Sequence, residues 1–236
     1  MRILLIGYGK MGKAIETSAK ARNHTIAGKI DPFMGLSFDF KSQVDVAIEF
    51  STPESAPHNI KLCLNQHIPV VAGTTGWLQH KKEIDAYCSQ QQGAFFYASN
   101  YSLGVNIFFK LNEHLARMIK TQNEYDVSID EIHHDQKKDA PSGTAITLAE
   151  GILQNSSKKK QWVKHETQRQ EDLVIRSFRE GEAPGTHIVK YKSPIDDIEI
   201  KHTAYSREGF ATGAVLVAEW LPNQKGVLGM DDFLKF

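Results

Sequence analysis

The chain has 236 residues, of which 41% are hydrophobic and 24% charged, with 28 basic and 28 acidic side chains. This length suffices for one large or two modest domains, and the balanced charge gives no basic surface for nucleic acid. Two cysteines exclude a disulfide framework. There is no basic leader before the first strand and no apolar run of membrane-spanning length, so we expect a cytoplasmic protein without a nucleic-acid or membrane partner.

The first strand is expected at residues 2–6, and a helical pattern begins at Lys13. A G-x-G-x-x-G motif stands between them, which predicts a dinucleotide-binding turn rather than a purely structural one. Its first glycine permits the tight turn, the second lets the pyrophosphate approach the backbone, and the third lets the helix pack closely. The motif consists of Gly7, Tyr8, Gly9, Lys10, Met11 and Gly12.

A second strand, residues 25–30, ends at Asp31. An acid at this position suits the ribose 2′-hydroxyl of a dinucleotide, although Asp31 could also be a simple turn residue before Pro32. Because its carboxylate would repel a 2′-phosphate, and because Lys29 is expected on the other face of the strand, we favour NADH, with NADPH possible.

Further strands are expected at residues 44–50, 69–72 and 94–98, with helices at 54–65 and 78–92. Ser51 or Thr52 is expected to cap the first of these helices. The connection 31–43 is too short and irregular for a full helix. Alternating strands and helices predict a Rossmann-like, doubly wound parallel sheet of the α/β class. The turn Gly73-Thr74-Thr75-Gly76 follows a strand of this sheet, so it is either a ligand-binding turn or an ordinary connection.

The second half predicts a different domain. A helix at 105–118 carries an apolar stripe that we assign to the core: Ile107, Phe108, Leu111, Leu115 and Met118. A strand at 125–133 and a helix from 145 to about 154 follow, and the basic run 158–160 is expected to meet solvent. Strand-like runs at 164–179, 186–193, 197–205 and 213–218 predict an α+β domain with a mixed, open-faced sheet that other subunits would cover. Phe210 onward is read as a helix and tail. The predicted boundaries are 1–101 for the dinucleotide-binding domain, 102–210 for a substrate-binding and oligomerisation domain, and 211–236 for a C-terminal return to the first domain.

The segment from Glu131 to Ala145 joins a strand, a charged loop and a helix start. Ser142 is a good N-cap, and the N–H groups of Gly143 and Thr144 would then favour an anion. An anion site beside histidines and lysines suggests a small carboxylate or phosphate substrate and proton transfer. The alternatives are a solvated surface loop and a metal site. We expect no metal, because the neighbouring His133 and His134 point to opposite faces of a strand.

The residues of this segment resemble a known family motif. The run His133-His134-x-x-Lys137-x-Asp139-Ala140-Pro141-Ser142-Gly143-Thr144-Ala145 resembles the motif of the 4-hydroxy-tetrahydrodipicolinate reductase family, also called dihydrodipicolinate reductases. The resemblance extends along the chain through residues 7–12, 49–53, 72–76, 100–106 and 206–211. Three features depart from the family pattern: a glycine loop shorter by one residue, an abbreviated 31–43 connection and a short total length.

The resemblance implies reduction of 4-hydroxy-tetrahydrodipicolinate, via dihydrodipicolinate, to tetrahydrodipicolinate in diaminopimelate and lysine biosynthesis. It implies a catalytic pair, His133 and Lys137, and substrate-binding positions at His134, Gly143 and Thr144. It also implies a homotetramer built through the sheet of the second domain. The implied cofactor-binding positions are Gly7, Tyr8, Gly9, Lys10, Met11, Gly12, Asp31, Gly73, Thr74, Thr75, Ala98, Ser99, Asn100 and Tyr101.

The residues suit this chemistry. The cyclic dicarboxylate accepts a hydride and the product needs a proton, which an ammonium at Lys137 can donate while offsetting substrate charge. His133 can donate or accept a proton near neutral pH. Two other functions stay open: a different two-domain nicotinamide oxidoreductase of amino or hydroxy acids, and a non-catalytic nucleotide-sensing protein.

Overall fold

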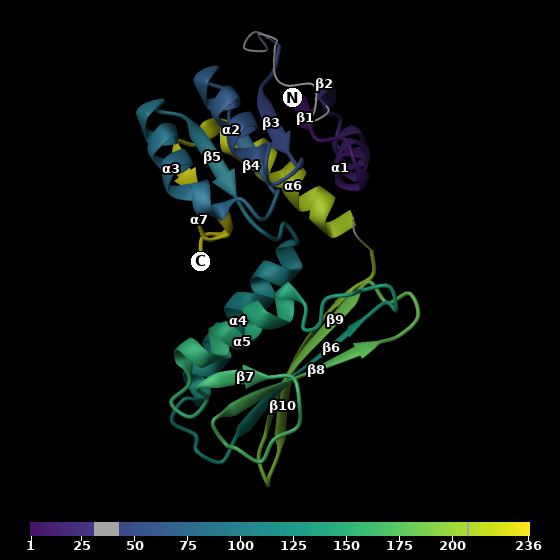
Figure 1. The fold of residues 1–236 in the computed structure, drawn as a ribbon, viewed down its shortest axis with the longest axis vertical. Helices are drawn as coiled ribbons and strands as arrows, with labels where there is room; N and C mark the ends of the chain where they lie inside the picture. The colour runs from purple at the N-terminus through teal and green to yellow at the C-terminus, as the bar shows by residue number, and fades with distance from the viewer. Residues whose placement is uncertain (31–42, 207) are drawn as a thin grey trace. The chain divides into compact units, whose positions relative to one another are not determined.

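The computed structural model describes residues 1–30, 43–206 and 208–236, so Asp31 and nearly all of the 31–43 connection lie outside the described residues. The chain divides into two units (Figure 1). Unit 1 comprises Met1–Leu103 and Glu208–Phe236, and unit 2 comprises Gly104–Arg207.

A parallel sheet of six strands forms the centre of unit 1, in the order β11-β5-β4-β3-β1-β2. β1, β3 and β4 are nearly continuous apolar runs, as expected for parallel strands covered on both faces. The strands are β1 (Arg2–Ile6), β2 (Thr25–Ile30), β3 (Val46–Glu49), β4 (Val70–Ala72), β5 (Ala94–Tyr97) and β11 (Gly226–Leu228).

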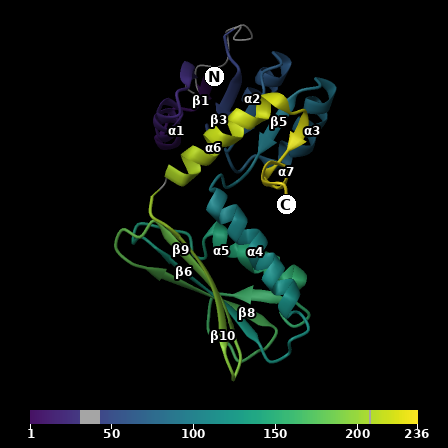
Figure 2. The same ribbon diagram turned by 180° about the vertical axis from the view of Figure 1, so that it is seen from behind.

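Helices cover both faces of this sheet. Leu5 packs in one cluster with residues of α1, α6 and α7, whereas Leu4 packs in the other with residues of α2 and α3. Figure 2 shows α6 lying across the first of these faces. The predicted doubly wound, Rossmann-like sheet is therefore confirmed. The helices are α1 (Lys10–Ala21), α2 (Ala56–Asn65), α3 (Lys81–Gln90), α6 (Glu208–Trp220) and α7 (Met230–Leu234), with short 3-10 helices η1 (Leu78–His80) and η2 (Leu221–Asn223).

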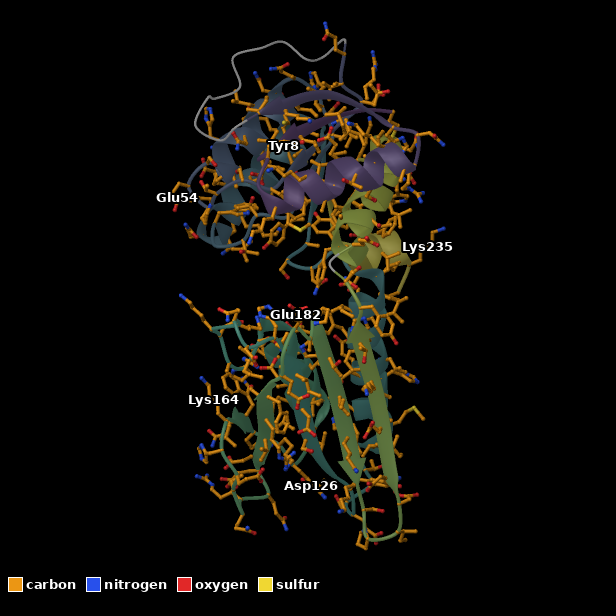
Figure 3. All side chains as sticks on the ribbon, turned by 90° about the vertical axis from the view of Figure 1, so that its right-hand side faces the viewer. Tyr8, Glu54, Asp126, Lys164, Glu182 and Lys235 are labelled. Atoms are coloured by element: carbon orange, nitrogen blue, oxygen red, sulfur yellow. The ribbon has the colours of Figure 1, made fainter. Side chains whose placement is uncertain are left out.

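Unit 2 is built on a mixed sheet of five strands in the order β10-β9-β6-β8-β7, as predicted for the second domain. β6 pairs antiparallel with β9 and parallel with β8. Two helices pack on one face, and Asp126 and Glu182 mark opposite ends of the sheet (Figure 3). The elements are α4 (Leu103–Ile119), β6 (Asp126–His133), α5 (Gly143–Asn155), β7 (Gln161–Val163), β8 (Asp172–Arg179), β9 (Gly185–Lys192) and β10 (Asp197–Ala204).

Several predicted elements were wrong. The run 213–218, predicted as a strand, lies inside α6, because a fully buried apolar segment has no periodicity that separates helix from strand. α1 begins at Lys10 rather than Lys13. The three-residue strands β7 and β11 were not predicted, since so short a run gives no pattern.

The apolar stripe of α4, which was predicted to lie in the core, is only partly buried. The side chains of Ile107, Leu111 and Met118 are 51%, 47% and 63% exposed, whereas Phe108 is buried. The helix turns Asn112 inward as well, because its side-chain amide donates to the carbonyl of Leu148 in α5 at 3.0 Å. A satisfied amide can occupy a core position that a count of apolar residues would not assign to it.

Two local polar predictions were also wrong. Neither Ser51 nor Thr52 caps α2, whose N-cap position is Ser55 without a side-chain cap bond. Lys159 is buried rather than solvated: its ammonium donates to the Asp172 carbonyl at 2.7 Å and pairs with Asp126 at 2.6 Å. Among the described residues, no helix has both the length and the apolar character needed to span a membrane.

Candidate active site

The ends of four neighbouring strands of unit 1 lie in register at one edge of the sheet. Ile6 pairs with Glu49, Glu49 with Ala72, and Ala72 with Tyr97. The turns that follow these strands therefore lie side by side, where open parallel sheets bind ligands. The structure thus brings together three predicted cofactor segments: Gly7–Gly12, Gly73–Thr75 and Ala98–Tyr101.

The glycine turn has the geometry that a nucleotide needs. Gly7 adopts φ +90°, and a Cβ atom there would lie 2.0 Å from the carbonyl oxygen of Phe50. A Cβ atom at Gly12 would lie 2.4 Å from the carbonyl oxygen of Gly7. A Cβ atom at Gly9, the N-cap of α1, would meet no atom within 4 Å. The protein's own packing explains the first and third glycines, and the open space at Gly9 fits a pyrophosphate at a helix N-terminus.

The other two segments are held by contacts within unit 1. The buried Thr74 hydroxyl accepts a hydrogen bond from the Ser51 N–H at 2.8 Å. A Cβ atom at Gly73 would lie 2.1 Å from the Phe50 ring. Tyr101 is buried, and its hydroxyl donates to the Ala72 carbonyl at 2.7 Å. Within residues 98–101, Ser99 is the exposed residue.

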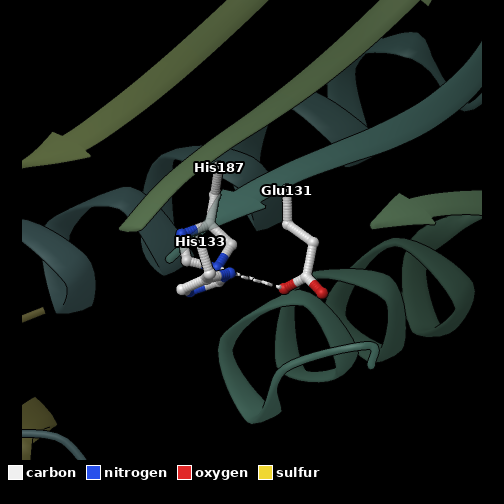
Figure 4. Close-up of side chains that lie close together, drawn as sticks. All are labelled: Glu131, His133 and His187. Carbon is white, nitrogen blue, oxygen red and sulfur yellow. Dashed lines mark ion pairs between the residues drawn. The ribbon is translucent and has the colours of Figure 1, made fainter. Parts of the chain in front are cut away.

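In unit 2, three buried side chains converge at the end of β6 (Figure 4). Glu131 and His133 are two residues apart on one strand and so share a face. His187 joins them from β9, where it pairs directly with Glu131. The nearest Glu131 oxygen lies 3.4 Å from Nδ1 of His133 and 3.7 Å from Nε2 of His187. His187 was not predicted as a site residue from the sequence, although it alternates with the apolar Val189 and Tyr191 on the buried face of β9.

The carboxylate of Glu131 also reaches the start of α5. Both of its oxygens lie 3.0 Å from the backbone N–H of Ser142, and one accepts a bond from the Ser177 hydroxyl at 2.7 Å. The Ser142 hydroxyl accepts the N–H of Ala145 at 3.2 Å, which confirms the predicted N-cap, and it lies 3.1 Å from Nε2 of His187.

The loop between His133 and Ser142 carries the predicted lysine. The Lys137 ammonium bonds both carboxylate oxygens of Asp139 at 2.8 Å. Arg179, at the end of β8, donates to the backbone carbonyls of Lys137 at 3.1 Å and Asp139 at 2.5 Å. A Cβ atom at Gly143 would meet no atom within 4 Å, so the space beside the N-terminus of α5 is open to a ligand. His134 and Thr144 are half-buried in the same region.

Burial and charge set the protonation of this site. Burial lowers the pKa of His133, and the charges of Lys137 and Arg179 lower it further against the opposing effect of Glu131. Burial raises the pKa of Glu131, but hydrogen bonds from Ser142 and Ser177 outweigh it, so its pKa lies below the ordinary value. A neutral His133 beside an ionised Glu131 at neutral pH is the result.

His187 makes the fold sensitive to acid. Burial lowers its pKa from 6.5 to about 4. Between these values the unfolded chain binds a proton that the folded chain does not, so stability falls as the pH falls from 6.5 to 4, by on the order of 3 kcal/mol for this group. Hydrogen-exchange protection of the β6 and β9 amides, corrected for intrinsic rates, should follow this loss. This protection should depend less on pH in His187→Gln. In the exposed control His114→Gln, its pH dependence should equal that of the wild type. Equal slopes in all three proteins would contradict the assignment.

Glu131, His133 and His187 could also hold a metal ion, since their donor atoms all lie within 4.8 Å of one another. The carboxylate, however, already accepts bonds from Ser142 and Ser177. The absence of a resident metal stays a prediction.

A glycine turn at the edge of a doubly wound sheet, joined to a mixed-sheet unit with a lysine loop and an open helix mouth, defines a two-domain nicotinamide-dependent oxidoreductase. Residues 1–101 match the family model described as dihydrodipicolinate reductase, N-terminus, and residues 104–234 match dihydrodipicolinate reductase, C-terminus. The chain belongs to the dihydrodipicolinate reductase family, as the sequence resemblance indicated.

Individual relatives agree with this assignment. The chain is 49% identical over 234 residues to a 4-hydroxy-tetrahydrodipicolinate reductase of Christiangramia forsetii, covering 99% of this chain and 98% of the relative. It is 31% identical to the same-named protein of Methanoregula boonei, covering 96% and 94%. A dipicolinate-bound dihydrodipicolinate reductase from Paenisporosarcina sp. TG-14 shares the fold, with a TM-score of 0.81, 21% identity and 99% coverage of both chains.

Proposed function

We propose that this chain reduces 4-hydroxy-tetrahydrodipicolinate in unit 2, at the loop that carries Lys137 and the N-terminus of α5. A nicotinamide dinucleotide would bind at the glycine turn of unit 1. The reaction itself, a step of diaminopimelate and lysine biosynthesis, follows from the family match and confirms the predicted oxidoreductase function. The observation that carries the assignment of residues is the convergence of His133 and the capped start of α5, the two ends of the loop that carries Lys137, on one buried carboxylate.

The substrate is a cyclic dicarboxylate. One carboxylate would bind the N–H groups of Gly143 and Thr144, where the open space at Gly143 admits a ligand and the helix N-terminus favours an anion. Lys137 would leave Asp139 to meet the substrate, donating the proton that the product needs and offsetting its charge. His133 acts beside it as a neutral hydrogen-bonding group, and His134 contributes to substrate binding.

The cofactor supplies a hydride when bound. The residues that would hold it are Gly7–Gly12, Asp31, Gly73–Thr75 and Ala98–Tyr101, and we favour NADH over NADPH. Lys29 was expected on the far face of β2, but its ammonium donates to the hydroxyl of Tyr8 in the glycine turn at 2.9 Å. It also pairs with Glu16 at 2.7 Å, so its charge is already balanced and gives little support for a 2′-phosphate.

We also propose a homotetramer built through the sheet of unit 2. Helices α4 and α5 cover one face, and residues of the other face such as Ser128, Asp130 and Ile132 are half-buried in the single chain. Light scattering should give the mass of four chains. The mass of one chain at assay concentrations would contradict this proposal.

Turnover tests the function directly. The substrate is made in situ by the enzyme that precedes this step, and the fall in NADH or NADPH absorbance is followed. We expect rapid NADH oxidation and slower use of NADPH. Tight NADH binding without turnover would indicate a nucleotide sensor instead, and turnover of a hydroxy or amino acid alone would indicate a different oxidoreductase.

A further inference from the structure

The carboxylate of Glu131 has no solvent exposure, yet within unit 2 it contacts both His133 and the first turn of α5. We propose that Glu131 and Arg179 are positioning residues that hold the Lys137 loop and the mouth of α5 in the arrangement that binds and protonates the substrate. The inference rests on the proposed function, and it adds two residues that need not touch substrate or cofactor.

Glu131 ties together the two ends of the loop. The loop leaves the sheet at His133 and ends at Ser142, and the same carboxylate lies 3.4 Å from the His133 ring and accepts the Ser142 N–H at 3.0 Å. The Ser177 hydroxyl orients this carboxylate from β8 at 2.7 Å. A change at residue 131 therefore reaches the histidine and the first turn of α5 together, although these are separated along the chain.

Arg179 fixes the middle of the loop. Its guanidinium donates to the carbonyls of Lys137 and Asp139, which bracket the loop segment that presents the lysine. It also donates to its neighbour Phe178 at 2.7 Å and lies 3.7 Å from Glu131. These bonds go to the backbone, so they set the course of the loop and leave the Lys137 ammonium free to move from Asp139 to a substrate. A lysine at 179 could not make such a fork of bonds.

The two residues also set the charge around His133. The charged and titratable groups that act on its ring are Glu131, Lys137, Asp139, Arg179 and His187. Changing Glu131 to glutamine removes the negative charge that favours a protonated ring, while the cations stay. The pKa of His133 should therefore fall further, so the His133 titration reports the loss of this charge separately from any change in the fold.

The test compares Glu131→Gln, Arg179→Ala and Arg179→Lys with two matched controls. Asp172→Asn alters another buried carboxylate of unit 2, bonded to Gln161 and Thr167, and Arg169→Ala removes an exposed arginine of unit 2 that pairs with Glu171. Circular dichroism verifies the fold. Steady-state kinetics give kcat and KM, fluorescence titration gives the Kd for NADH, and NMR gives the titration of His133.

We expect kcat to fall by about tenfold to a hundredfold in all three site variants, the usual cost of a misplaced catalytic group, with KM for substrate raised and the Kd for NADH unchanged. Added guanidinium should restore part of the activity of Arg179→Ala, and Glu131→Gln should shift the His133 titration to lower pH. The controls should stay within about twofold of the wild type. Arg179 is partly exposed, so its variants provide the test even if Glu131→Gln does not fold.

Near-wild-type kcat and KM in folded Arg179→Ala would overturn the positioning role of Arg179. Unchanged kcat and KM in folded Glu131→Gln would overturn that of Glu131, whatever the His133 titration shows. If instead Lys137→Ala and His133→Ala keep full activity, the proposed catalytic site itself fails, which is a distinguishable outcome.

Discussion

Replacing Lys137 with alanine should lower kcat by about a hundredfold or more, the usual contribution of a positioned acid or base. The Lys137 ammonium bonds the exposed carboxylate of Asp139, and an exposed ion pair contributes little to stability. The variant should therefore fold normally and bind NADH as the wild type does. Steady-state turnover measures the effect on catalysis, and the thermal midpoint measures any effect on stability.

The neighbouring lysine provides the control. Lys138 is exposed and lies in the same loop, so Lys138→Ala removes the same charge at nearly the same place. We expect it to keep turnover close to that of the wild type. Near-wild-type turnover in Lys137→Ala, or an equal loss in both variants, would remove Lys137 from the mechanism.

The second large effect is expected on replacing glycines of the turn, where Gly7 is required by packing and Gly9 by the approach of the cofactor. At Gly7 a methyl group would lie 2.0 Å from the Phe50 carbonyl oxygen, and the backbone has φ +90°. Gly7→Ala should therefore destabilise unit 1 by several kcal/mol, at the upper end of the range for overpacking and backbone strain (about 1–3 kcal/mol each). Cofactor binding should be lost with it.

Gly9→Ala is the matched variant at the same turn. No atom lies within 4 Å of its added methyl group, and φ is −77°, so the fold should keep its thermal midpoint. A pyrophosphate approaching this backbone would meet the methyl group, so NADH binding should weaken by at least about tenfold. Equal thermal midpoints in the two variants, or wild-type NADH binding in Gly9→Ala, would contradict this account of the turn.

The sequence predicted the parts of the site that depend on local spacing. Ser142 caps α5 as expected, and the glycine motif lies between a strand and a helix because these features are set by a few adjacent residues. The charged loop could be recognised for the same reason. Glu131, His187 and Arg179 come from three strands, and only the pairing of β6 with β8 and β9 brings them together. No single-strand pattern contains that information.

The fold shows the same limit. β1 and β2 were predicted with the boundaries that the structure gives, since each is a short run beside a clear turn. The strand β11 joins the sheet of unit 1 beside β5, a pairing between residues far apart in the sequence. The rotation of α4, which buries Asn112 and exposes Leu111, depends on the position of α5. Tertiary packing thus decided what local propensity left open.

The most direct test is a crystal structure of the chain with NADH and pyridine-2,6-dicarboxylate. We predict one carboxylate on the N–H groups of Gly143 and Thr144, with the Lys137 ammonium within hydrogen-bond distance of the ligand and the nicotinamide facing its ring. A ligand bound away from the start of α5, with Lys137 still paired to Asp139 in every subunit, would contradict the account.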